Sequence, residues 1–383
     1  MIYLDNAATS WPKPAGVARA VSAALTRCAG NPGRTSHHLA MDAAALIQEC
    51  REQLAQLFCI ANPLRICFTS NATEALNLAI KGVLAPGDHA ICSSMEHNSV
   101  WRPLTALAER GVELSIAEAS SSGIVDVKTV DALVRPNTKL IAILHASNVN
   151  GAIQPVAEIG ALARAHGIPF LVDASQSAGA IPIDVQAMRI DLLAFPGHKG
   201  LLGPQGTGGL YVSEEVNLRP LKEGGTGSES NSSHQPSFYP DRLESGTLNL
   251  PGIAGLSESV RYLLQKGVER IARKEAKRTG LLLAGLAKIE GVAVYGPPIG
   301  LPRAPVVSFN IRGMDPVTVA AELERRADIA CRPGWHCAAL AHRTQGTHKT
   351  GTVRFSLGAF TTMVEIDSAL SAVAEIAEKN QMQ

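Results

Sequence analysis

Short apolar runs alternate with longer amphipathic stretches from about residue 65 to residue 212. This alternation is typical of strands and crossover helices in an α/β sheet. The run at 140–144 is apolar at every position, which indicates a strand buried on both faces of a mainly parallel sheet. We therefore predict strands at 65–69, 89–93, 140–145, 169–173, 191–195 and 209–212, with helices such as 73–84, 100–110 and 156–166 between them.

The rhythm breaks at residues 223–240, where Gly, Ser, Asn and Pro dominate. This composition predicts a long loop, and a loop of this size inside a compact chain is often functional. A helical run rich in Leu, Ala, Lys and Arg follows at about 255–289. The rest of the chain predicts a smaller α+β domain, with strands at 292–296, 306–311, 328–332 and 352–357 and helices near 316–326 and 363–378.

Composition narrows the class of protein. Hydrophobic residues at 46% and charged residues at 18% are close to globular averages and argue against disorder, collagen and coiled coil. A formal net charge of +1 supplies no global field for nucleic acid or an anionic membrane, so we expect neither as a partner. We find no signal peptide in MIYLDNAATS and no apolar run near the ~18 residues of a membrane span. Seven scattered cysteines, an odd number, then favour a cytoplasmic protein with reduced thiols.

Lys199 has a sequence context that favours chemistry over simple surface exposure. The apolar run 191–195 leads almost directly into Gly197-His198-Lys199, and a glycine-rich turn and another apolar run follow. A lysine that is partly desolvated at the mouth of a strand can keep its amine neutral and nucleophilic, as Schiff-base chemistry requires. Flanking glycines let a cofactor come close. The glycines at 203–209 precede their strand, so they form no dinucleotide fingerprint.

Polar residues follow the ends of four other predicted strands. Asp173 ends one strand, and Gln176 comes three residues later. His97 and Asn148 follow two further strands, and Ala72-Thr73 opens a helix after the strand at 65–69. A strand-end Asp and a helix-opening Asn or Thr also serve as ordinary caps. In a parallel sheet, however, such strand ends converge on one crevice. In such a crevice, a carboxylate is suited to keep a pyridinium nitrogen protonated, and a helix N-terminus is suited to bind phosphate.

Cys337 is a second reactive candidate, in a predicted loop after Gly334-Trp335-His336. Arg332 and Arg354 lie nearby in sequence, and basic neighbours favour the thiolate form of a nucleophile. The alternative is a zinc cluster of His336, Cys337, His342, His348 and Cys331. No paired-cysteine motif accompanies these residues, so we expect no metal. The other cysteines fall in apolar patterns, and we expect buried, unreactive side chains at Cys28, Cys50, Cys59, Cys67, Cys92 and Cys331.

A series of motifs spans nearly the whole chain: YLDNAAT, NATEALN, EHNS, SNVNGAIQP, VDASQSAG, GHKGLLGPQG, LESGTLN, RPGWHCA and VRFSLGAFTT. Together and in this order they resemble the pyridoxal-phosphate-dependent cysteine desulfurases of the class V aminotransferase fold. The RxGxHC segment resembles the type II branch, which also contains selenocysteine lyases. The resemblance implies fold type I: a large domain at 15–264 with a mainly parallel seven-stranded sheet, and a small α+β domain formed by 1–14 and 265–383.

The resemblance also implies a role for each candidate residue. It makes Lys199 the Schiff-base lysine, with Asp173 at the pyridine nitrogen and His97 stacked on the ring. Many family members have a hydroxyl residue as a phosphate ligand where this chain has Pro196. The implied cofactor-binding residues are Ala72, Thr73, His97, Asn148, Asp173, Gln176, His198, Lys199 and, from the second subunit of a homodimer, Thr247.

The activity implied by the resemblance is conversion of L-cysteine to L-alanine. Arg354 would bind the substrate carboxylate with help from Arg332 and Asn148, and Cys337 would hold the sulfur as a persulfide for a protein acceptor. Two enzyme alternatives stay open: a lyase acting on L-selenocysteine, and a cysteine or cystine C–S lyase. A cofactor-free binding or scaffold protein of the same fold is the alternative outside enzymes.

Overall fold

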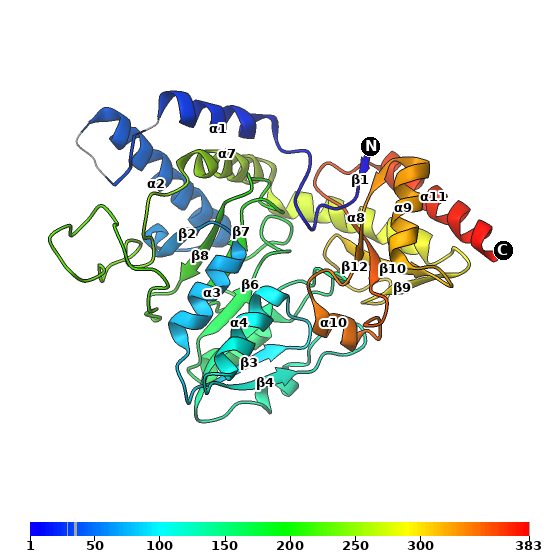
Figure 1. Cartoon of the computed structure of the whole chain (residues 1–383), viewed down its shortest axis with the longest axis horizontal. Helices are drawn as coiled ribbons and strands as arrows, with labels where there is room; N and C mark the ends of the chain where they lie inside the picture. The colour runs from blue at the N-terminus through cyan, green and yellow to red at the C-terminus, as the bar shows by residue number, and fades with distance from the viewer. Residues whose placement is uncertain (29, 34–36, 383) are drawn as a thin grey trace.

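A seven-stranded sheet forms the centre of the larger part of the computed structural model, which describes residues 1–28, 30–33 and 37–382 (Figure 1). Its strands are β2 (Ile66–Thr69), β3 (His89–Ser93), β4 (Glu113–Ala117), β5 (Thr138–Leu144), β6 (Phe170–Asp173), β7 (Leu192–Pro196) and β8 (Gly208–Val212). The order is β2-β8-β7-β6-β5-β3-β4, and only the two pairs that involve β8 are antiparallel. The predicted mainly parallel α/β sheet is confirmed, and β4 is an edge strand that the pattern analysis missed.

Both faces of this sheet are covered by helices, which explains the continuous apolar runs. Along β5, Ile141 and Ile143 pack on one face, and Leu140 and Ala142 pack on the other. The first face is covered by α2 (His38–Phe58), α6 (Val156–Ala165) and α7 (Leu250–Lys266), and the second by α3 (Ala72–Val83) and α4 (Asn98–Ala108). The remaining elements here are α1 (Ala15–Arg27), which packs on α7, the 3-10 helix η1 (Pro63–Arg65) and α5 (Val127–Asp131).

The C-terminal part builds a second, smaller sheet with its own core. Strands β9 (Val292–Tyr295), β10 (Val306–Ile311), β12 (Arg332–Gly334) and β13 (Thr352–Ser356) form an antiparallel sheet in the order β12-β13-β10-β9. Helices α8 (Val268–Leu286), α9 (Pro316–Ala327) and α11 (Met363–Gln381) pack against it, and α10 (Ala339–Thr344) follows the loop that carries Cys337. The domain boundaries at 14/15 and 264/265 stay a prediction.

One predicted strand of this part, at 328–332, is wrong as a single element. The chain changes partners at Cys331: β11 (Ile329–Ala330) pairs in parallel with β1 (Ile2–Tyr3), whereas β12 pairs with β13. The pattern of apolar residues could not show this, because the partner of β11 lies at the far N-terminus. The change of partner brings Arg332 opposite Arg354 in the register of β12 and β13.

The segment from Leu4 to Ser10, which we call the N-terminal strap, crosses from the small sheet to the loop of Lys199. Leu4 lies in the core of the small sheet, and its carbonyl accepts from the Ser356 N–H (2.7 Å). At the other end, the Ser10 N–H donates to the His198 carbonyl (3.0 Å). The strap therefore ties the residue before Lys199 to the strand that carries Arg354.

The loop at 223–240 contains no helix or strand, as predicted, and projects away from the sheet near α2 (Figure 1). All seven cysteines are free thiols. The expectation that Cys59 is buried is wrong, because it is the exposed left-handed cap at the end of α2. Cys28 and Cys331 are half-buried and the other three are buried as expected. Over the described residues, no helix is both long and apolar enough to cross a membrane.

Candidate active site

The carboxyl ends of five strands converge on one cavity. Residues at or just beyond the ends of β2, β3, β5, β6 and β7 line it, as expected for a mainly parallel sheet. The lining consists of Asn71, Ala72, Thr73, His97, Ser99, Leu144, Ala146, Asn148, Asp173, Ser175, Gln176, Pro196, His198 and Lys199. The structure thus brings together every predicted cofactor-binding residue except Thr247.

Lys199 lies in this cavity, and Asp173 is the charged group that acts on it most strongly. Burial lowers the pKa of the Lys199 amine to about 8, and Asp173 opposes part of that effect. The charges of Arg354 and Arg332 lower it further. At slightly alkaline pH a large fraction of this amine is therefore neutral, which is the form that acts as a nucleophile or a base.

His97 begins α4 and is connected to the start of α3 by hydroxyl groups. The Ser99 N–H donates to His97 Nδ1 (3.1 Å), the Ser99 hydroxyl also lies against Nδ1 (2.9 Å), and Thr73 Oγ1 lies 2.8 Å from that hydroxyl. Burial is the main cause that lowers the pKa of His97 to about 4, and Asp173 opposes it. The ring is therefore neutral near pH 7 with its proton on Nε2, a state that suits stacking on an electron-poor ring.

The start of α3 lies at one end of the cavity. Asn71 caps this helix by accepting from the Glu74 N–H (2.9 Å), and the N–H groups of Ala72 and Thr73 have no partner within the helix. His198 Nδ1 is buried and has no hydrogen-bond partner in the described part of the chain. These donors fit the phosphate of pyridoxal phosphate, and Asp173 fits its ring nitrogen. Pro196 also lines the cavity but has no donor to offer.

Gln176 and Asn148 line the cavity, but each also holds a segment from elsewhere. Gln176 Nε2 donates to the Ala7 carbonyl of the strap (3.0 Å), and Asn148 Nδ2 donates to the His336 carbonyl (2.6 Å). Thr247 lies outside this cavity: its side chain is exposed and borders two other hollows. Its predicted role in the cofactor site of a second subunit therefore stays a prediction.

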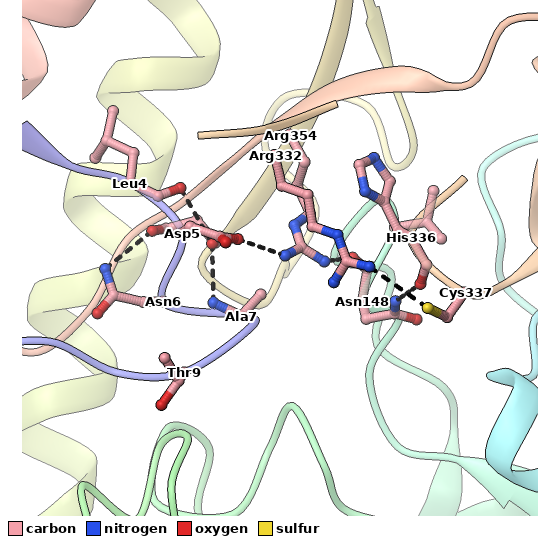
Figure 2. Close-up of polar contacts among 12 residues, drawn as sticks. Leu4, Asp5, Asn6, Ala7, Thr9, Asn148, Arg332, His336, Cys337 and Arg354 are labelled. Carbon is pink, nitrogen blue, oxygen red and sulfur yellow. Dashed lines mark hydrogen bonds and ion pairs between the residues drawn. The ribbon is translucent and has the colours of Figure 1, made fainter. Parts of the chain in front are cut away.

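The loop of Cys337 docks beside the cavity through its backbone (Figure 2). The Cys337 carbonyl accepts from the N–H of Asn98, the neighbour of His97 (2.8 Å). His336 and Cys337 have left-handed backbones, with φ of 48° and 58°, a conformation that non-glycine residues rarely adopt. This turn leaves the Cys337 side chain exposed, with Arg332 Nη2 3.4 Å from its sulfur. A thiolate on Cys337 thus has a cation beside it and solvent access.

Two of the three histidines of the zinc alternative have hydroxyl partners. His336 Nε2 lies 3.0 Å from the Thr352 hydroxyl, and His342 Nδ1 lies 2.7 Å from the Thr347 hydroxyl. Across residues 1–28, 30–33 and 37–382, three or more His, Cys, Asp or Glu side chains nowhere gather closely enough to hold a metal ion. The side chains of His336 and His342 are therefore engaged by threonine hydroxyl groups.

Arg354 is buried in the small sheet, with its guanidinium between Asp5 and Asn148 (Figure 2). Its Nη1 donates to the Asn148 carbonyl (3.0 Å), and its Nη2 forms an ion pair with Asp5 Oδ1 of the strap (2.7 Å). Arg332 lies opposite it across β12 and β13. The two predicted substrate-binding arginines are thus adjacent, next to Asn148 and the Cys337 loop.

Sequence analysis missed several residues that contribute to the site. Ser99, Ser175 and Asn71 line the cavity, and Asp5 pairs with Arg354. All four fall inside motifs that were singled out, namely EHNS, VDASQSAG, NATEALN and YLDNAAT. The signal was therefore present, but no pattern within one motif tells which polar residue turns toward a cavity.

The chain is similar over nearly its whole length to known proteins of one family. The aminotransferase class-V family model matches residues 2–369. A probable cysteine desulfurase of Methanothermobacter thermautotrophicus is 38% identical over 382 residues, covering 98% of this chain and 94% of that protein. Cysteine desulfurase IscS of Salmonella arizonae is 35% identical and covers 97% of this chain and 91% of its own. The apo structure of a cysteine desulfurase from Thermococcus onnurineus NA1 has a TM-score of 0.93 at 35% identity, covering 99% of this chain and 95% of that one.

Proposed function

Because the chain belongs to the class V aminotransferase family and is a cysteine desulfurase, we propose that it converts L-cysteine to L-alanine and keeps the sulfur as a persulfide on Cys337. One observation carries this proposal. The exposed Cys337 thiol, with Arg332 beside it, lies on a loop bonded both to Asn148 in the cavity of Lys199 and to Asn98 next to His97.

The family implies pyridoxal phosphate as the cofactor, and we propose which residues hold it. Lys199 would hold it covalently, Asp173 would face its ring nitrogen, and Gln176 and Asn148 would lie at its phenolic oxygen. Its phosphate would lie at the start of α3, on Ala72, Thr73 and His198. When bound, this cofactor withdraws electrons from the α-carbon of an amino acid and so acidifies the α-proton.

The side chains of the site supply the remaining chemistry. Arg354 and Arg332 bind the carboxylate of L-cysteine, and the Lys199 amine removes the α-proton. The Cys337 thiolate attacks the substrate sulfur, so that a sulfur–sulfur bond forms while the substrate Cβ–S bond breaks. The three-carbon fragment takes up one proton at Cβ, regains one at Cα and leaves as L-alanine. Arg332 Nη2 lies 3.4 Å from the Cys337 sulfur and so places a positive charge beside the attacking group.

The products of L-cysteine turnover test this function. The purified enzyme, incubated with L-cysteine and a thiol reductant, is expected to release alanine and sulfide in equal amounts, because the substrate keeps its amino group. A parallel incubation with L-selenocysteine measures the preference between the two substrates. If pyruvate and ammonia replace alanine, the enzyme is a C–S lyase and the persulfide proposal is wrong.

We also propose that the enzyme is a homodimer. The polar loop at 223–240 is tied to the SGT segment, since the Gly246 N–H donates to the Gly225 carbonyl (2.8 Å) and Gln235 Nε2 donates to Ser245 Oγ (3.0 Å). The same loop and Thr247 border a wide hollow beside α2. An exposed threonine presented by an anchored loop is suited to reach the phosphate of a neighbouring subunit.

A substitution at Thr247 tests the dimer. Thr247→Ala is expected to weaken cofactor binding about tenfold to a hundredfold, because a hydrogen bond to a charged group contributes roughly 1.5–3 kcal/mol. Titration of the apoprotein with the cofactor measures this, with the exposed Thr26→Ala as the matched control. Analytical ultracentrifugation of the wild type should show a dimer. A monomer with full cofactor occupancy, or a Thr247→Ala variant that binds like the wild type, would contradict the proposal.

A cytoplasmic location and a protein sulfur acceptor complete the proposal. Free thiols at all seven cysteines fit a reducing compartment. The exposure of Cys337 lets the thiolate of an acceptor protein attack its persulfide without opening of the fold.

A further inference from the structure

Asp5 of the N-terminal strap pairs with the arginine to which the proposed function assigns the substrate carboxylate (Figure 2). Arg354 is only 1% exposed, and its Nη2 lies 2.7 Å from Asp5 Oδ1. The second contact of this guanidinium is neutral, from Nη1 to the Asn148 carbonyl at 3.0 Å. Asp5 therefore supplies the carboxylate that compensates this buried charge.

Asp5 is fixed to the strand that carries Arg354. On one side the Ser356 N–H donates to the Leu4 carbonyl (2.7 Å), and on the other the Ala7 N–H donates to Ser356 Oγ (2.9 Å). The Asp5 carbonyl accepts from the Ala8 N–H (3.0 Å), which closes a tight turn. Ser356 is two residues from Arg354 on β13, so these hydrogen bonds hold Asp5 beside the strand of Arg354. Asp5 is therefore a fixed part of the structure around Arg354.

The pairing with Asp5 leaves donors of Arg354 for a second carboxylate. A guanidinium has five N–H donors, and the two contacts with Asp5 and Asn148 use two of them. Arg354 Nε is buried and has no partner among the described residues. Asp5 and a substrate can thus bind the same guanidinium at the same time, and neither needs to displace the other.

Two other cationic side chains lie near Arg354. Arg332 lies opposite it in the β-ladder, and Arg354 lies close enough to Lys199 to lower the pKa of its amine. Without Asp5, a guanidinium shielded from water would face these cations uncompensated, which is strongly unfavourable. Arg354 would then move away from Arg332 and toward water, and the carboxylate site would lose its geometry.

We propose that Asp5 is a positioning residue for substrate binding: its carboxylate holds Arg354 where the guanidinium meets the carboxylate of the amino acid. This inference rests on the proposed role of Arg354. It assigns a function to the YLDNAAT segment, which runs along β13 and ends at the loop of Lys199.

The variant Asp5→Asn tests this role, because it removes the charge and keeps the shape. We expect KM for L-cysteine to rise about tenfold to a hundredfold, on the scale that a misplaced binding group costs, while kcat changes much less. The Kd for L-cysteine, from the change in the absorption spectrum of the holoenzyme, should rise with KM. Cysteamine, which lacks the carboxylate, should bind as it does to the wild type. Asp5→Ser serves as a second variant, so that one poorly folding protein does not decide the result.

Two further variants separate the possible outcomes. Asp328→Asn removes a carboxylate that pairs with the amine of Met1, three residues before the strap, and this variant should bind both ligands normally. Arg354→Lys should weaken the binding of L-cysteine but not the binding of cysteamine. If Arg354→Lys binds L-cysteine normally, the proposed role of Arg354 fails and this inference falls with it. Suppose instead that Arg354→Lys binds L-cysteine more weakly than the wild type. The inference alone is then overturned if the Asp5 variants bind L-cysteine as tightly as the wild type or more tightly, or if their affinities for L-cysteine and cysteamine fall equally.

Discussion

Replacing Cys337 with alanine is expected to reduce alanine formation from L-cysteine by about a thousandfold or more, because the variant lacks the nucleophile that accepts the sulfur. The cavity of Lys199 should stay intact, since Cys337 is bonded to its surroundings through its backbone carbonyl rather than its side chain, apart from Arg332. The variant is therefore expected to remain yellow and to change its absorption spectrum when L-cysteine binds. Rapid-mixing absorbance and an alanine assay measure the two effects separately.

The control for this variant is Cys59→Ala, which removes another exposed thiol from the end of α2 and should leave turnover unchanged. Selenium is a better leaving group than sulfur and depends less on attack by a thiolate. Turnover of L-selenocysteine is therefore expected to fall less than turnover of L-cysteine. Alanine formation from L-cysteine at the wild-type rate in Cys337→Ala would contradict the persulfide mechanism.

Replacing Lys199 with alanine is expected to abolish turnover, by about a thousandfold or more, because one amine both holds the cofactor and moves the α-proton. General-base catalysis alone contributes roughly 10²–10⁴-fold. The variant should fold, since the cavity gives this side chain space rather than close packing. Cofactor retained after gel filtration and the rate of alanine formation are the measurements.

Lys13→Ala is the matched control for Lys199→Ala. Burial lowers the pKa of Lys13 to about 8, as it does for Lys199, and Lys13 Nζ donates to the His198 carbonyl (2.8 Å). Both lysines thus have a lowered pKa and lie near the site. Of the two, only Lys199 lines the cavity with Asp173 and His97. Lys13→Ala should keep its colour and activity. If Lys13→Ala lost the cofactor and Lys199→Ala retained it, Lys13 rather than Lys199 would be the lysine that holds the cofactor.

The sheet and the cavity were predictable because their signals are local. A strand buried on both faces must be apolar throughout, as at 140–144, and parallel strands must place their carboxyl ends on one edge. Residues that follow those ends, such as Asp173 and His97, therefore had to meet. The edge strand β4 was missed because its outer positions are partly exposed and it lacks a continuous apolar run.

The contacts that sequence reasoning missed join residues far apart in the chain. Asp5 and Arg354 are separated by 349 positions, and Asn148 and His336 by 188. Whether a polar side chain faces a cavity or holds a distant loop depends on how the small sheet docks on the large one, which no local pattern records. The motif order along the chain indicated the family, whereas pairings of this kind required coordinates.

Chemical trapping of the cofactor tests the central claim most directly. Reduction of the purified yellow enzyme with borohydride, followed by proteolysis and peptide mass analysis, should find a pyridoxyl group on the peptide that contains Lys199 and on no other lysine. A label on another lysine, or no label after reconstitution with pyridoxal phosphate, would contradict the account.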